Sequence, residues 1–225
     1  GRVVYDNLRK FVRLLLSANF DEILVICAAW ILGWPVPLLP VQILWMNMVT
    51  DGLPALALSV GPAERDVMRR RCRGPHENML QAMIPFLVVS ALVMGTGTLA
   101  MFVWGMHTGG IGRARTLALS TAVFFELLIA FNCQSDTRSV FSIGFPNRYL
   151  VWAVAGAALL QFAVTHIPLA QAALHVQALG ALDWVLVAAV SSPALLISPR
   201  RLVRSSMYVG GTAGNAPDRS APDLT

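Results

Sequence analysis

Long apolar runs separated by short polar segments divide this chain into six parts. The runs cover about residues 14–33, 40–60, 80–104, 117–132, 149–165 and 181–197. Most of them approach the roughly 20 apolar residues that a helix needs to cross a bilayer. A helix satisfies its backbone polar groups internally, which the bilayer interior requires. The pattern therefore predicts an all-α fold, a polytopic membrane bundle of six transmembrane helices.

The second run is interrupted by polar and helix-breaking residues. Residues 44–58 read LWMNMVTDGLPALAL, which places Asn47, Thr50 and Asp51 at i, i+3 and i+4, on one helical face. Pro54 lacks a backbone N–H and crowds the carbonyl group of Thr50. We therefore expect a broken second helix, in which side-chain oxygens and freed backbone carbonyls meet at membrane depth. Such breaks occur where the backbone lines a cavity or an ion site.

Composition supports a membrane protein and argues against other classes. Hydrophobic residues make up 56% of the chain and charged residues 13%, which leaves too little polar surface for a soluble domain of this length. The net charge of +5 does not indicate nucleic acid as a partner, because the arginines lie in short loops without interleaved aromatic residues. The cysteines Cys27, Cys72 and Cys133 are far apart, so we expect no disulfide or metal site from them.

The placement of basic residues predicts the topology. Apart from Arg113, Arg115 and Arg219, every lysine and arginine flanks ends of the apolar runs that a six-span path places on one side. By the positive-inside rule this side is the cytoplasm, and the Gly-rich loop that holds Arg113 and Arg115 faces outward. We expect an integral, multi-pass membrane protein with both termini in the cytoplasm. Its predicted parts are a cytoplasmic stalk (1–13), a transmembrane domain (14–197), and a basic anchor with a disordered tail (198–225).

Acidic residues inside the predicted spans indicate a cation or proton site. An unpaired acid near the bilayer centre costs several kcal/mol, and no basic residue lies in these spans to pair with Glu22, Asp51 or Glu126. Asn19 precedes Glu22 by one helical turn and shares its face. Asp21 falls on a different face, and we interpret it as a polar neighbour within the bundle. Each of the neutral polar residues has an alternative role as an interhelical hydrogen-bonding group.

Several segments resemble type II P-type cation ATPases. They are residues 1–7 (GRVVYDN), 17–22 (SANFDE), 32–38 (LGWPVPL) and 41–55 (VQILWMNMVTDGLPA). They are similar to the fifth and sixth transmembrane helices of that family, and most similar to the sarcoplasmic-reticulum-type calcium pumps. The likeness continues through Asp66-x-Met68 and through Glu126 with Asn132. It implies that this chain is the C-terminal transmembrane part, with the last six helices of such a pump.

The resemblance also implies which residues bind the ion. It places Asn19, Glu22, Thr50, Asp51 and Glu126 around one calcium-type site, and Asn47 with Asp51 in a second site that a helix outside this chain completes. Calcium takes about 6 to 8 oxygen ligands from carboxylates, amides and carbonyls, and this set supplies many of them. The loop segment RRRCR at 69–73 departs from the proline-containing segment of the family, so contacts with cytoplasmic domains do not carry over.

By the same resemblance, the chain forms the cation-binding part of an ATP-driven pump that transports Ca²⁺. The phosphorylated aspartate, the nucleotide-binding and actuator domains and the first helices of the family have no counterpart here, so we expect a piece of a longer protein without catalytic residues of its own. Mg²⁺ and ATP then act through those other domains, which are the expected partners together with the lipid bilayer. Two alternatives are a secondary or proton-coupled transporter that uses the acids as a relay, and a membrane scaffold that transports nothing.

Overall fold

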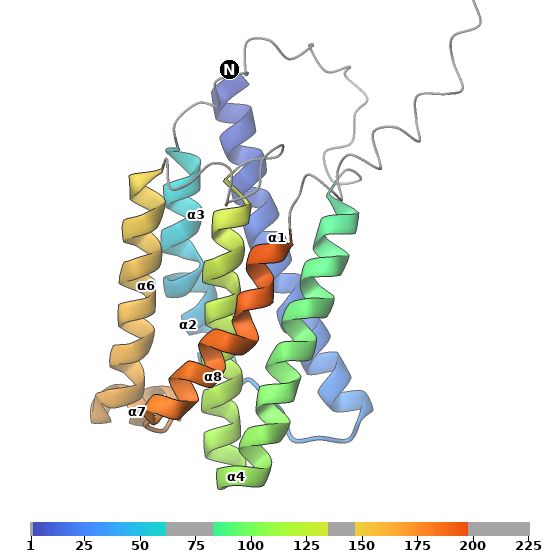
Figure 1. Ribbon diagram of the computed structural model, residues 1–225, viewed down its shortest axis with the longest axis vertical. Coiled ribbons are helices and arrows are strands. Elements are labelled where there is room, and N and C mark those ends of the chain that lie inside the picture. Colours follow the sequence, from blue (N-terminus) through green and yellow to red (C-terminus); the bar gives the residue numbers. More distant parts are fainter. Residues whose placement is uncertain (1, 62–82, 135–146, 198–225) are drawn as a thin grey trace, which may run out of the picture.

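In the computed structural model, residues 2–61, 83–134 and 147–197 are described, and their regular elements are all helices (Figure 1). In chain order these are α1 (Arg2–Ile31), α2 (Pro40–Trp45), the π-helix η1 (Met46–Thr50), α3 (Gly52–Ser59), α4 (Ile84–Asn132), α6 (Arg148–His166), α7 (Pro168–Leu174), α8 (Ala181–Ser191) and the 3₁₀-helix η2 (Ser192–Leu196). The longer helices lie roughly parallel to one axis (Figure 1). The predicted all-α class is therefore confirmed for this part of the chain.

Three of the described helices are long and apolar enough to cross a membrane. They cover Val3–Ile31, Ile84–Asn132 and Arg148–His166, and Ala181–Leu196 forms a shorter apolar helix. The six predicted runs thus do not correspond to six separate long helices. Residues 84–104 of the third run and the whole fourth run lie within α4, and the run 40–60 is divided among α2, η1 and α3. The last run changes from α-helix to 3₁₀-helix at Ser192–Pro193, because proline disrupts the α-helical hydrogen-bond pattern.

The segment between the third and fourth runs is helical, whereas the sequence predicted a loop. The backbone is helical on both sides of Gly110, and α4 reverses direction there (Figure 1). Gly110 has φ 77° and ψ −172°, a conformation that glycine adopts without a Cβ clash. The two legs, 84–109 and 111–132, pack closely, because a Cβ on Gly105 would overlap the Cα of Ala114. A reversal at a single glycine replaces the longer loop.

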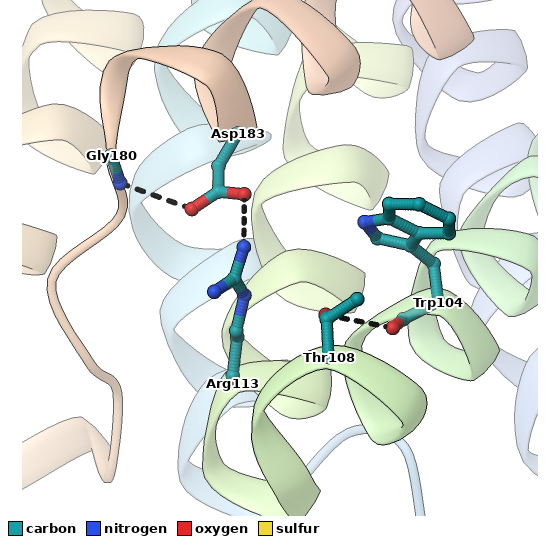
Figure 2. Close-up of polar contacts among 5 residues, drawn as sticks. All are labelled: Trp104, Thr108, Arg113, Gly180 and Asp183. Carbon is teal, nitrogen blue, oxygen red and sulfur yellow. Dashed lines mark hydrogen bonds and ion pairs between the residues drawn. The ribbon is translucent and has the colours of Figure 1, made fainter.

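The reversal end of α4 is tied to α8 by an ion pair. Arg113 Nη2 lies 2.7 Å from Asp183 Oδ1, and the other oxygen of Asp183 accepts a hydrogen bond from the Gly180 amide at 3.0 Å (Figure 2). On the first leg, the Thr108 hydroxyl donates to the carbonyl of Trp104 (Figure 2). Arg113 therefore belongs to the packed part of the bundle, although its position in the sequence suggested a solvated loop.

The second leg of α4 occupies the centre of the bundle. Leu117, Ala118, Ala122 and Val123 on this leg are completely buried, and the hydroxyl of Ser191 in α8 donates to the carbonyl of Thr121 at 3.4 Å. A helix that is apolar on all sides is typical of such a central position. This burial places Glu126 inside the bundle and away from lipid.

Some expectations concern residues outside the described part. They include the arginine loop with Asp66, Met68 and residues 69–73, the segment 135–146, and the basic anchor and tail from residue 198 onward. The expected stalk, residues 1–13, is helical from Arg2 and continues into the first predicted span within α1.

Candidate cation-binding site

The second predicted span is broken where the sequence places its polar residues. In η1 the carbonyl of Met46 accepts the amide of Asp51 at 2.9 Å, five residues later, and also the hydroxyl of Thr50 at 3.0 Å. Pro54 has no N–H to donate to the preceding turn, and α-helical bonding resumes when the Ala55 amide donates to the carbonyl of Asp51 at 3.0 Å. Such single π-turns are frequent at functional sites. Here the turn carries Asp51 at its end.

Asn47 connects the broken helix to α1. Its Nδ2 donates to both carboxylate oxygens of Glu22, at 2.8 and 3.0 Å, and to the carbonyl of Ile43 at 3.1 Å. Glu22 is only 5% exposed. A buried carboxylate needs hydrogen-bond donors or a counter-charge, and the Asn47 amide supplies two of these bonds.

Asp51 and Glu126 face each other on the opposite side of the turn. Their carboxyl groups are within hydrogen-bonding range, and each residue is 1% exposed. Within the described residues, Asp51 Oδ2 and both oxygens of Glu126 have no donor. An ionised carboxylate accepts hydrogen bonds but cannot donate one. The two groups therefore need a shared proton or a cation between them.

Glu22 lies near the same pair. Its carboxylate is close enough to interact electrostatically with both Asp51 and Glu126. The three acids that the sequence singled out, on α1, at the end of η1 and on α4, are thus brought together in the structure.

Asp21 is a fourth acid in this group. It is 1% exposed, and neither of its carboxyl oxygens has a hydrogen-bond partner in the described part of the chain. It interacts electrostatically with Glu22, Asp51 and Glu126. Asp21 thus lies within the bundle, as the sequence suggested, but it has no hydrogen-bonding partner among the described residues. On α1, Asp21 lies beside Gly95 of α4, and Glu22 accepts the hydrogen bonds from Asn47 of η1.

The two remaining predicted ligands, Thr50 and Asn19, differ in burial. Thr50 is fully buried and its hydroxyl is bonded within its own turn to Met46. Asn19 is exposed, and its Nδ2 donates to the carbonyl of Leu15 on its own helix at 2.7 Å. Asn19 thus lies at the surface of the described bundle, although its spacing from Glu22 is one helical turn.

In the described part of the chain, the four acids have no basic side chain as a partner, in contrast to Asp183. Over the same residues, no group of three or more His, Cys, Asp or Glu is arranged to hold a metal ion with the side chains as they stand. Buried acids that repel one another require protons or cations. Chemically, the arrangement offers oxygen atoms that can accept positive charge.

Known proteins are similar to this chain in sequence. The family model described as "Cation transporting ATPase, C-terminus" matches residues 35–201. A calcium-transporting ATPase of Bacillus subtilis (strain 168) is 41% identical over 209 residues, which cover 91% of this chain and 23% of that protein.

Two further relatives come from other organisms. Calcium-transporting ATPase type 2C member 2 of Mus musculus is 35% identical over 202 residues, covering 88% of this chain and 21% of its own length. The probable cation-transporting ATPase F of Mycobacterium tuberculosis (strain H37Rv) is 36% identical over 201 residues, covering 88% and 22%. The chain thus spans less than a quarter of the length of these relatives.

Proposed function

The chain belongs to the cation-transporting P-type ATPases, as a C-terminal membrane part, and from this premise we propose that its buried acids bind calcium as the transported ion of an ATP-driven pump. The observation that carries the proposal is the meeting of Asp51 and Glu126 beside the π-turn. Both carboxyl groups are buried, and in the described residues no donor neutralises Glu126 or the second oxygen of Asp51. A divalent cation between them relieves this repulsion.

The available oxygens suit calcium. Calcium accepts carboxylate, amide, hydroxyl and carbonyl oxygens in a flexible shell of about 6 to 8 ligands. We assign Asn19, Glu22, Thr50, Asp51 and Glu126 to one site, and Asn47 with Asp51 to a second that a helix outside the chain completes. Among the described residues, His, Cys, Asp and Glu side chains alone do not form a metal site. The proposed sites therefore also use amide, hydroxyl and backbone carbonyl oxygens.

Binding requires side chains to move. The Asn47 amide now donates two hydrogen bonds to Glu22 through its nitrogen, and we infer that the cation of the first site replaces these bonds, which frees the Asn47 carbonyl oxygen for the ion of the second site. Asn19 likewise leaves its bond to Leu15. The π-turn supports this change, because its backbone is already displaced from α-helical bonding at Thr50 and Asp51.

We further propose six membrane crossings. They are α1, the broken segment α2–η1–α3, the two legs of α4, α6, and α8 with η2. Both termini lie in the cytoplasm, and Gly110 lies on the opposite side. Single cysteines introduced at Gly110 and Gly74 in sealed cells test the arrangement: labelling of position 110 alone from outside supports it, and labelling of position 74 from outside contradicts it.

ATP hydrolysis belongs to domains outside this chain. The relatives are far longer than the chain, and we propose that the remaining helices and cytoplasmic domains supply phosphorylation, nucleotide binding and Mg²⁺. Transport by the full-length protein is then the appropriate assay. Membrane vesicles that contain it are expected to take up calcium when ATP is added, and this uptake is expected to disappear in Asp51→Asn.

A proton-coupled function is the second candidate, and one observation favours it. Asp51 and Glu126 lie within hydrogen-bonding range of each other, which in the absence of a cation requires a proton on one of them. The vesicle assay separates the two functions. Cation uptake driven by an imposed proton gradient without ATP supports the proton-coupled transporter, and uptake that requires ATP supports the pump.

A further inference from the structure

We propose that Asp21 is an additional acidic ligand of the cation site and binds the transported divalent cation from the side where α1 packs on α4. The inference rests on the proposed function, since it concerns the same site. The resemblance and the spacing of polar residues both left Asp21 out of the ligand set.

The burial of Asp21 is the first argument. The residue is 1% exposed, and both Oδ1 and Oδ2 lack a hydrogen-bond partner among the described residues. By comparison, the similarly buried Asp183 has an ion pair with Arg113 and a bond from the Gly180 amide (Figure 2). A buried carboxylate without either kind of partner needs a proton or a bound cation.

The position of the carboxyl group is the second argument. It is close enough to interact electrostatically with Glu22, Asp51 and Glu126, which belong to three different elements. Asp21 therefore points into the same acidic group and not to lipid. A cation held by the other three acids also attracts the Asp21 carboxylate.

Gly95 in the first leg of α4 provides the space for this carboxylate. A Cβ on Gly95 would lie 3.2 Å from Asp21 Oδ1 and would overlap the Cδ2 atom of Leu24. The absent side chain thus lets α1 place an acid against α4. Thr98 follows one helical turn later; it is fully buried, and its hydroxyl has no partner in the described part of the chain. The Thr98 hydroxyl therefore offers a neutral oxygen on the same face of α4 as Gly95.

The charge itself is the last argument. Asparagine has nearly the shape of aspartate, and a neutral amide is less costly to bury than a carboxylate. A carboxylate at this position is favourable when a cation shares its charge. The number of charged ligands is one of the properties that set calcium affinity, so Asp21 is expected to strengthen binding.

The test is calcium binding to the purified full-length protein, measured for wild type, Asp21→Asn, Asp51→Asn and the control Asp183→Asn. Thermal melting is measured for each with and without calcium. Asp21→Asn is expected to weaken calcium binding at least about tenfold, because it removes a charged ligand. Without calcium its melting temperature is expected to equal or exceed that of wild type, because an uncompensated buried charge is removed. Asp183→Asn is expected to lower the melting temperature and leave calcium affinity within about twofold.

Gly95→Ala is the second variant, which retains the charge. Its methyl group presses on the Asp21 carboxylate, so we expect Gly95→Ala alone to weaken calcium binding. Added to Asp21→Asn, it should cause no further loss of affinity, because the two residues act through one contact.

The possible results separate the two proposals. If Asp21→Asn binds calcium like wild type while Asp51→Asn does not, the role of Asp21 is wrong and the proposed function stands. If Asp21→Asn melts lower or fails to fold without calcium, its carboxylate is structural and the inference is likewise wrong. If neither aspartate affects calcium binding, the proposed function is also wrong.

Discussion

Asp51 and Glu126 face each other across the contact between the broken helix and the second leg of α4, with their carboxyl groups within hydrogen-bonding range. Asp51 ends a π-turn, where the backbone departs from α-helical bonding, and Glu126 is buried on α4. Under the proposed function, a cation bound between them would connect the broken helix to α4, and ion binding would be coupled to the shape of the broken helix.

Replacing Glu126 by glutamine is expected to stabilise the protein without calcium. The glutamine amide can donate to Asp51, which supplies a bond that two carboxylates cannot form without a proton. The same change removes a charge from one proposed site, so calcium affinity is expected to fall, by less than in Asp51→Asn. Thermal melting without calcium and calcium titration measure the two effects. A lower melting temperature together with unchanged calcium affinity would contradict the assignment.

Removing the Asn47 side chain is expected to leave Glu22 without its donors. Asn47→Ala breaks both bonds to a buried carboxylate, so the free energy of unfolding without calcium should fall by about 1–3 kcal/mol. Asn19→Ala is the matched control. Its amide is exposed and bonds its own helix, so the expected change is within about 0.5 kcal/mol. Equal effects of the two variants would show that the Glu22 contact does not stabilise the fold.

The ion pair at the reversal end of α4 is expected to stabilise the packing of α8. Arg113 is 34% exposed and Asp183 8% exposed at their side chains, so Arg113→Ala should cost about 1–2 kcal/mol, between the values for surface and buried pairs. Arg115→Ala serves as the control, because Arg115 is bonded to the carbonyl of Val36 at an exposed position. Melting curves distinguish them, and a larger loss in Arg115→Ala would refute this role of the pair.

The close contact of the α4 legs is expected to depend on Gly105. Gly105→Ala places a methyl group against the backbone of Ala114, and overpacking of this kind costs about 1–3 kcal/mol. Gly156→Ala is the comparison, because a Cβ at this helical position in α6 meets no atom within 4 Å. It is expected to be neutral or to stabilise by up to about 1 kcal/mol. Thermal unfolding measures both, and a neutral Gly105→Ala would mean that the legs are further apart than described.

The sequence predicts much of this architecture because the bilayer imposes strong constraints. Apolar length indicated the helices, and the position of Pro54 indicated the break at Thr50 and Asp51. The cost of buried charge singled out Glu22, Asp51 and Glu126, which the structure brings together. These predictions depend on local chemistry, which is available from the sequence.

Other features depend on neighbours that the local pattern does not specify. Helical spacing gave Asn19 and Glu22 a common face, yet Asn19 is exposed and Asp21 is buried, because α4 packs on the side of α1 that holds Asp21. The cost argument used for Glu22 also applies to Asp21 and would have identified it. The glycines near residue 110 suggested a loop, whereas a single positive φ at Gly110 is sufficient to reverse α4.

The most direct test of the central claim is equilibrium calcium binding to the full-length protein and to its Asp51→Asn variant. The substitution preserves volume and an oxygen atom but removes the charge that both proposed sites share. The account predicts that wild type binds calcium saturably and that folded Asp51→Asn loses binding at both sites. An Asp51→Asn protein that binds the same number of calcium ions with unchanged affinity would contradict it.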